Sequence, residues 1–176
     1  MTGSHSAFVE VYVFRRRGRR VEVLCLRRGR VRFLPGAWQP VTGRRRLRES
    51  GLAAAAREVR EETGLVPLRW WALEAPTVFY DASRDRMRAY PRFVAEAAPD
   101  AAVRLSHEHV DWAFLPAAAA GRRYLWESQR LGLADVKRQV LRGGPLAAAL
   151  EVTELMARRP SRVRPGAARG RKAPRP

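Results

Sequence analysis

The sequence predicts an α+β fold in which helices flank a mixed β-sheet, that is, an α/β/α sandwich. Three observations lead to this prediction. Apolar segments rich in valine come first, a helix-forming segment follows, and the same succession of strand-rich and helical sequence then repeats. The 176 residues are enough for one domain with its own core and leave room for a tail. We therefore expect a single domain over residues 1–157 and a separate tail over residues 158–176.

Two short apolar segments near the N-terminus predict a β-hairpin. Residues 7–14 (AFVEVYVF) and 21–26 (VEVLCL) have strand composition, and the RRRGRR sequence between them places Gly18 at the turn. Cys25 is the only cysteine, so no internal disulfide can form. A buried structural thiol is its expected role, which fits a reducing cytoplasm.

The next segment predicts a helix with three glutamates on one face. Residues 52–63 are rich in Ala, Leu, Glu and Arg, Ser50 can cap the start, and Gly64 can end the helix. Spacings of i, i+3 and i+4 place three carboxylates on the same face: Glu58, Glu61 and Glu62. Such carboxylates repel one another unless a cation lies among them, and a hard divalent ion such as Mg²⁺ prefers oxygen ligands.

Two later segments predict further strands, and each contains a proline. Residues 65–79 predict a strand with a break at Pro76, and residues 87–95 predict a strand in which Pro91 marks an edge or a bulge. Three aromatic side chains here could stack on a base or pterin ring, although core and edge packing is the favoured interpretation of each: Trp70, Trp71 and Tyr80.

The remainder of the domain is predicted to be helical. Residues 116–120 and 124–141 carry an imperfect apolar stripe that is broken at Gly132, and residues 143–145 (GGP) end it. Residues 146–156 predict a further helix that packs on the domain or on a second copy of it. No stretch approaches the roughly 20 apolar residues of a membrane span, and the N-terminus has no secretory pattern. We expect a cytoplasmic monomer or homodimer without membrane association.

The glutamate helix belongs to a longer pattern. This pattern is a Gly, five residues, a Glu, seven residues, and then Arg-Glu-apolar-X-Glu-Glu-X-Gly-apolar. The chain fills every position of it, with Gly43, Glu49, Arg57, Glu58, Val59, Glu61, Glu62, Gly64 and Leu65. The pattern is the Nudix box, and the chain therefore resembles the Nudix hydrolases. The resemblance implies an α/β/α sandwich and a metal-dependent attack of water on a diphosphate.

The resemblance also implies roles for individual residues. Metal ligands would come from the three helix glutamates, Glu58, Glu61 and Glu62, and from the carbonyl of Gly43, with Mg²⁺ as the ion and Mn²⁺ as a substitute. Glu49 and Arg57 would hold the loop and orient the helix carboxylates, and Gly64 would end the helix. The carboxylates and Arg57 are the candidate catalytic groups, and which carboxylate is the general base stays open.

A second stretch is similar to a segment that many Nudix enzymes carry before their last strand and helix. In SHEHVDWAFL, residues 106–115, this likeness makes Glu108 a candidate fourth acid, either an extra metal ligand or the general base. An ordinary loop carboxylate is the alternative. His107 and His109 are candidate proton carriers or ligands, although loop histidines are usually neither.

Substrate contacts are expected from Arg27, Trp38 and Gln39, which lie just before the box. The Trp-Gln pair, the Glu108 stretch and the Ala-rich turn that follows are similar to bacterial dihydroneopterin triphosphate and dATP pyrophosphohydrolases. The small-molecule substrate would then be a pterin or nucleoside triphosphate. Dinucleoside polyphosphates and ADP-ribose are alternatives, and a non-catalytic nucleotide-sensing role is a further one.

The net charge of +18 is extreme and is partly concentrated in the tail. From residue 158 onward eight basic residues occur without an acid: Arg158, Arg159, Arg162, Arg164, Arg169, Arg171, Lys172 and Arg175. The Pro, Gly and Arg composition cannot bury a core, so the tail is expected to be disordered. The charge reflects either compositional bias or a basic surface with weak nucleic-acid contact, and the latter would suit an RNA 5′-pyrophosphohydrolase.

Overall fold

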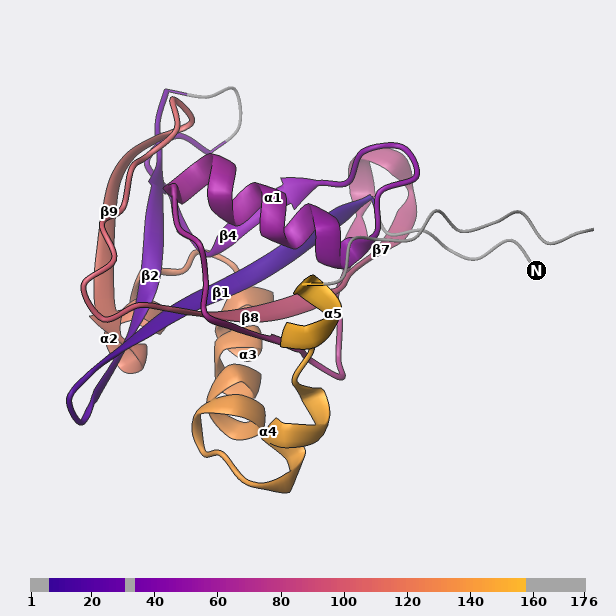
Figure 1. Cartoon of the computed structure of the whole chain (residues 1–176). Coiled ribbons are helices and arrows are strands. Elements are labelled where there is room, and N and C mark those ends of the chain that lie inside the picture. Colours follow the sequence, from indigo (N-terminus) through magenta and orange to yellow (C-terminus); the bar gives the residue numbers. More distant parts are fainter. Residues whose placement is uncertain (1–6, 31–33, 158–176) are drawn as a thin grey trace, which may run out of the picture.

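The fold was obtained as a computed structural model that describes residues 7–30 and 34–157, and it confirms the predicted α/β/α sandwich (Figure 1). A seven-stranded mixed sheet has the order β3-β2-β1-β8-β5, with β4 also paired to β1 and β9 to β2. Strands β1 and β8 are parallel, and the other pairs described in this sheet are antiparallel. Strands β6 and β7 form a separate two-stranded sheet.

The strands are β1 (Phe8–Arg17), β2 (Arg20–Arg28), β3 (Trp38–Gln39), β4 (Val41–Arg44), β5 (Arg69–Ala72), β6 (Thr77–Asp81), β7 (Arg86–Tyr90), β8 (Arg92–Ala97) and β9 (His109–Pro116). The helices are α1 (Gly51–Thr63), α2 (Ala117–Arg123), α3 (Glu127–Val136), α4 (Pro145–Leu150) and α5 (Thr153–Ala157), with a short 3₁₀ turn η1 (Ala82–Arg84) and a π-helical turn η2 (Lys137–Leu141).

Each face of the sheet has its own apolar core. Helices α1 and α5 cover one face, which we call the α1 face, and α2, α3 and α4 cover the other, the α3 face (Figure 1). Successive residues of β2 alternate between the two cores, because strand side chains point to opposite faces in turn: Leu24 and Leu26 lie under α1, whereas Val23 and Cys25 lie under α3.

Local sequence signals located the first hairpin and the central helix. The β1–β2 turn has Gly18 at φ 58°, as predicted, although β1 runs through three of the arginines assigned to the turn. Trp70 and Trp71 are buried in the two cores, so the packing interpretation is confirmed for them, whereas Tyr80 is exposed on β6.

Three sequence predictions of single elements were only partly right. The break predicted at Pro76 within residues 65–79 is present, but the strands on its two sides, β5 and β6, belong to different sheets. The strand predicted over residues 87–95 is divided at Pro91, where an edge or a bulge was predicted, into β7 and β8. The helix predicted over residues 146–156 is divided into α4 and α5, because the connection between them pairs with the edge of β5: the N–H of Val152 donates to the carbonyl of Trp70 at 2.8 Å.

Helix α3 passes through Gly132 without the predicted break. A Cβ at this position would lie 2.2 Å from the hydroxyl oxygen of Tyr12, so glycine lets α3 approach β1 closely. In the described part of the chain, no helix is long and apolar enough to cross a membrane. The predicted tail, residues 158–176, lies outside the described residues.

Candidate active site

Helix α1 presents the box glutamates, and its ends are fixed by the predicted caps. The Oγ of Ser50 accepts a hydrogen bond from the N–H of Ala53 at 3.1 Å. Gly64 adopts the left-handed conformation at φ 70°, and its N–H donates to the carbonyl of Arg60 at 2.9 Å. The helix begins at Gly51, one residue before the predicted start, and ends at Thr63 as predicted.

Arg57 joins most of the acidic residues of the box. Its guanidinium donates to both oxygens of Glu49, at 2.8 and 2.9 Å, in the bidentate geometry that suits an arginine and a carboxylate. The Nη1 atom also donates to Glu58 at 2.7 Å and to Glu61 at 2.9 Å, and Nη2 donates to the carbonyl of Arg44 at 2.9 Å. These bonds lower the pKa of Glu49 and raise that of Arg57.

Gly43 leaves room for the carboxylate of Glu58. Strand β4 pairs with β1, which brings Gly43 opposite Val9 and against α1. A Cβ on Gly43 would lie 1.9 Å from Cδ and 2.2 Å from Oε1 of Glu58. Position 43 therefore requires glycine, because the carboxylate of Glu58 occupies the space that a side chain at this position would need. Burial raises the pKa of Glu58, and the neighbouring Arg57 opposes this shift.

Glu62 is the buried acid of the group. Its side chain is 6% exposed, and Oε2 has no hydrogen-bond partner among the described residues. Burial first, and then the charges of Glu58 and Glu108, raise the pKa of Glu62 well above its usual value. His109 lies next to it at the start of β9, with Nε2 at 3.8 Å from Oε2 of Glu62. Burial lowers the pKa of His109.

Glu108 lies on the exposed loop just before β9. Its carbonyl accepts the N–H of Gly29 at 2.8 Å, which ties this loop to the end of β2. Its carboxylate is close enough to raise the pKa values of both Glu58 and Glu62. The structure therefore brings the predicted fourth acid to the box glutamates.

The three predicted substrate contacts are divided between the two faces of the sheet. Gln39 is buried and connects two neighbours, accepting from Arg28 at 3.2 Å and donating to Thr42 at 3.3 Å. Trp38 packs instead against the core of the α3 face, with the guanidinium of Arg123 at 4.4 Å from its ring centroid. Arg27 is opposite Trp38 in the β2–β3 ladder.

Strand alternation places Arg27 and Trp38 on the α3 face, away from the acids, and places Arg28 on the α1 face. The positive charge of Arg28 opposes the rise in the pKa of Glu62 and adds to the effect of burial in lowering the pKa of His109, so this arginine is the β2 cation beside the acids. Its even spacing from Leu24 and Leu26 is the sequence signal that could have identified it.

The described side chains do not form a ready metal centre, since no three His, Cys, Asp or Glu side chains among them are gathered closely enough to hold an ion. Glu58 and Glu61 are both engaged by Arg57. The residues nevertheless suit a divalent ion, because Glu62 has a buried oxygen without a partner and a hard divalent ion prefers oxygen ligands. An ion at this position would have to compete with Arg57 for the other two glutamates.

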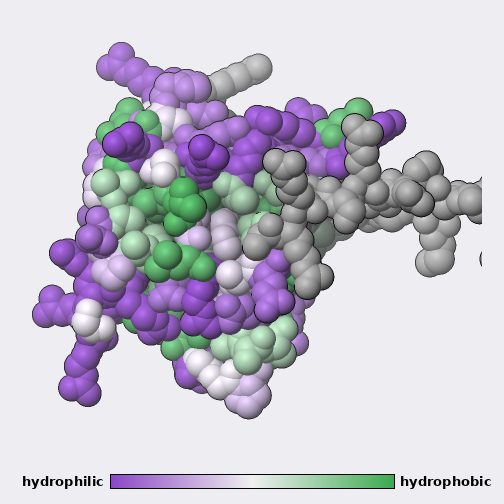
Figure 2. Space-filling model, in the orientation of Figure 1, coloured by the Kyte–Doolittle hydropathy of each residue, from purple (hydrophilic) through white to green (hydrophobic). Residues whose placement is uncertain are grey.

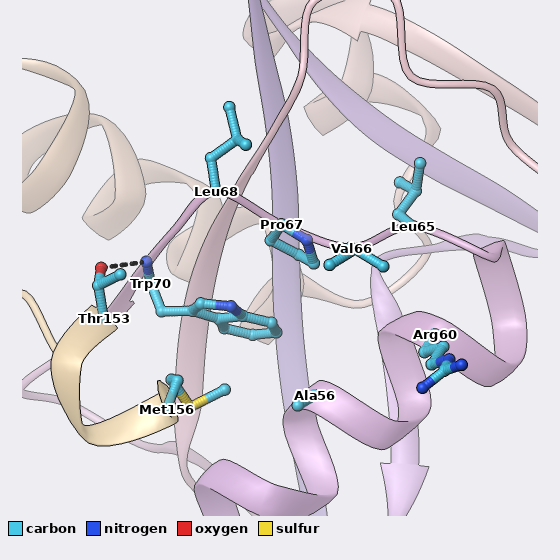
Figure 3. A pocket seen from close by; sticks show the side chains of 9 residues that line it. All are labelled: Ala56, Arg60, Leu65, Val66, Pro67, Leu68, Trp70, Thr153 and Met156. Atoms are coloured by element: carbon cyan, nitrogen blue, oxygen red, sulfur yellow. Dashed lines mark hydrogen bonds between the residues drawn. The ribbon is translucent and has the colours of Figure 1, made fainter. Parts of the chain in front are cut away.

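A groove on this side of the molecule is separate from the acids. It has a volume of about 410 Å³ and lies between α1, the segment before β5, and α5 (Figure 3). Its lining is mostly apolar and consists of Ala56, Arg60, Leu65, Val66, Pro67, Leu68, Trp70, Thr153 and Met156. Apolar areas on this face of the molecule are surrounded by hydrophilic residues (Figure 2). None of the box acids lines the groove, so it is not the candidate active site.

Comparison with known proteins shows which family this chain matches. The family model of the NUDIX domain matches residues 4–136, which is more than half of the chain. A curated octanoyltransferase from Myxococcus xanthus is 38% identical over 113 residues, covering 62% of this chain and 31% of that protein. Most of those aligned residues must lie within the NUDIX match, because few residues remain outside it. This chain thus spans about a third of the length of that relative.

Solved structures share the fold at low sequence identity. The structure of a C. elegans Ap4A hydrolase binary complex has a TM-score of 0.63 and 19% identity, covering 76% of this chain and 96% of that one. The MutT protein of Methanosarcina mazei Go1 gives 0.60 and 23%, covering 78% and 96%. The dihydroneopterin triphosphate pyrophosphohydrolase of E. coli gives 0.57 and 23%, covering 77% and 95%.

Proposed function

The chain belongs to the Nudix family of pyrophosphohydrolases, and we propose that it cleaves the diphosphate linkage of a nucleoside triphosphate or a related compound with a divalent ion. Mg²⁺ is the proposed ion, and Mn²⁺ would replace it. The observation that carries this proposal is the juxtaposition of the box acids around Arg57, with one oxygen of Glu62 buried and unpartnered. A cytoplasmic location is part of the proposal, because Cys25 is a buried free thiol, which suits a reducing compartment.

Each group at the site has a proposed role. The ion would be held by Glu58, Glu61 and Glu62, the carbonyl of Gly43, and Glu108. When bound, the ion neutralises phosphate oxygens and makes a bound water more acidic. Arg57 orients Glu58 and Glu61, because its own orientation is fixed by two bonds to Glu49. Arg28 attracts the polyanionic substrate to this end of the sheet.

Proton transfer requires a carboxylate near the attacking water. Glu58 and Glu108 are the two candidates for this general base. Glu58 is held between Gly43 and Arg57, whereas Glu108 is on an exposed loop, so the two differ in freedom of movement. Replacing each with glutamine and comparing pH–rate profiles would distinguish them.

An aromatic surface beside the acids supports a substrate with a planar ring. On β9, Trp112 is opposite Leu26 and Phe114 is opposite Leu24, which places both aromatic rings on the α1 face. Trp112 is 38% exposed, and its ring packs edge-on against Phe114 with the centroids 6.0 Å apart. It follows His109 by three residues, or roughly 10 Å along a strand. A ribose and a phosphate can bridge such a distance, so a base or pterin ring could stack on the indole.

The test is a substrate panel with Mg²⁺ and product identification. The panel contains dihydroneopterin triphosphate, dATP and the other nucleoside triphosphates, diadenosine tetraphosphate and ADP-ribose, with phosphoribosyl diphosphate as a compound without a base. Failure of well-folded protein to hydrolyse any of these would refute the proposed activity.

Substitution of Trp112 tests the ring contact within the same panel. We expect Trp112→Ala to raise KM about tenfold for ring-bearing substrates, since stacking on an aromatic side chain contributes about 1–3 kcal/mol per base. Trp112→Phe should keep most of the affinity, and hydrolysis of phosphoribosyl diphosphate should not change. Trp126→Ala is the matched control, because Trp126 is another exposed indole but precedes α3. Equal KM values for Trp112→Ala and the wild type would refute the ring contact.

A further inference from the structure

The side chain of His109 is buried without a hydrogen-bond partner. It is 2% exposed, and neither ring nitrogen has a partner among the described residues. Buried polar groups are nearly always hydrogen-bonded, and an exception calls for an explanation. An imidazole has at least one N–H to donate, so the explanation must involve an acceptor within reach.

The acceptor that faces His109 is the equally unpartnered oxygen of Glu62. The distance of 3.8 Å from Nε2 to Oε2 is too long for a hydrogen bond, but a carboxylate movement of less than 1 Å would form one. Glu108, which precedes His109, and Arg28, which is opposite it in the β2–β9 ladder, act on both residues of this pair. The charges of Glu58 and Glu61 act on Glu62 as well.

The backbone holds the two residues in position on separate elements. The N–H of Ser106 donates to the carbonyl of Glu62 at 3.2 Å, and the N–H of His109 donates to the carbonyl of Ser106 at 3.3 Å. The end of α1 is therefore connected through one residue to the start of β9. The close approach of the two side chains is a consequence of the fold and does not depend on a mobile loop.

We propose that His109 is a positioning residue for Glu62: its Nε2–H donates to Oε2 and so fixes the orientation of the carboxylate that binds the divalent ion. Carboxylates that bind metals are commonly held by such hydrogen bonds, and losing the partner typically weakens metal affinity 10- to 100-fold. The proposal rests on the proposed function only in assigning Glu62 to the ion. His109 itself contacts neither the ion nor the substrate.

The experiment measures Mn²⁺ affinity of the full chain by titration with detection of free Mn²⁺ by electron paramagnetic resonance. His109→Phe fills the same space without a donor and should weaken Mn²⁺ binding 10- to 100-fold. His109→Gln restores an amide donor of similar reach and should bind Mn²⁺ within a few-fold of the wild type. The control is Val110→Ala, which removes part of an exposed side chain next to His109 and should match the wild type.

A double-mutant cycle separates positioning from packing. In a Glu62→Gln background, His109→Phe should have no further effect on Mn²⁺ affinity, because the carboxylate it would position is gone. An equal loss in both backgrounds, or unchanged affinity in folded His109→Phe, would overturn the proposal. If His109→Phe does not fold, His109→Asn supplies the same comparison, since its shorter side chain cannot reach Glu62 and should show the same loss.

Turnover provides a second readout that is independent of affinity. With excess Mn²⁺, His109→Phe should recover most of the wild-type kcat, because the defect is in holding the ion. A kcat that stays low at saturating Mn²⁺ would assign His109 to the chemical step and contradict a positioning role. Mn²⁺ binding that depends on His109 and Glu62 in a protein that hydrolyses no substrate would refute the proposed function while supporting this inference.

Discussion

The close approach of Gly43 to Glu58 leads to a specific prediction for Gly43→Ala. The added Cβ would lie 1.9 Å from Cδ of Glu58, whereas carbon atoms in contact are separated by about 3.5 Å. The carboxylate must therefore move by about 1.5 Å and lose its bond to Arg57. A misplacement of about 1 Å at a catalytic group can lower the rate about 100-fold, and we expect kcat to fall by at least that factor.

The same substitution should leave the fold intact. The atoms that a Cβ would meet belong to the end of a flexible side chain, so the backbone of β4 does not have to move. Loss of one hydrogen bond changes the free energy of unfolding by about 1 kcal/mol, or about 2–4 °C in Tm for a chain of this size.

The assay is steady-state hydrolysis at saturating Mg²⁺, together with thermal unfolding of the same preparation. Gly121→Ala is the control, because a Cβ at Gly121 in α2 would make an ordinary contact of 3.7 Å with Leu133. A near-normal kcat for Gly43→Ala would show that the position of the Glu58 carboxylate does not limit the reaction, and the assigned role of Glu58 would be wrong.

Three further predictions concern the acids and the tail. The pKa of Glu62 is raised in the fold, so the folded protein without metal retains a proton that the unfolded chain loses, and the free energy of unfolding should fall as pH rises above about 4.5. Urea denaturation in EDTA at a series of pH values should show a smaller decline for Glu62→Gln than for the wild type. Equal dependence of the free energy of unfolding on pH in the two proteins would contradict this. Glu61→Gln should reduce turnover by orders of magnitude with unchanged Tm, since Glu61 is exposed; retention of the wild-type rate at saturating Mg²⁺ would exclude its metal role. Deletion of residues 159–176 should weaken RNA binding and flatten its salt dependence if the tail contacts phosphates, and unchanged binding would exclude that contact.

The sequence predicted best what neighbouring residues determine. The limits of α1 follow from Ser50 and Gly64, which act within one helical turn, and the box spacing places the glutamates relative to Arg57 along one helix. The division at Pro91 was not predictable in the same way, because both sides of the proline have strand composition. What separates them is that Phe93 and its neighbours pair with β1 in the main sheet, whereas β7 pairs only with β6 among the described strands.

The site was predicted less completely than the fold because it is assembled across strands. Arg27 and Arg28 are adjacent in sequence and equally basic, and only the alternation of β2 places Arg28 beside Glu62. By sequence, Trp38 was a reasonable aromatic contact for the substrate, but its side chain packs on the core of the α3 face. Trp112, far along the chain, is on the α1 face instead. Such choices depend on which face each residue occupies, and that depends on strand register.

The acids of α1 differ in how they are neutralised, and this difference suggests the order in which an ion would engage them. Glu58 and Glu61 share the positive charge of Arg57, which is itself held by Glu49, so an ion gains less by approaching them. Glu62 has no such partner, and burial, which raises its pKa, favours a proton on its carboxyl group when no ion is bound. An ion that binds Glu62 first therefore displaces only a proton, whereas Glu58 and Glu61 must each leave Arg57 before they can bind an ion. On this reasoning Glu62→Gln should weaken ion binding more than Glu61→Gln does, although both residues belong to the same motif and the same helix.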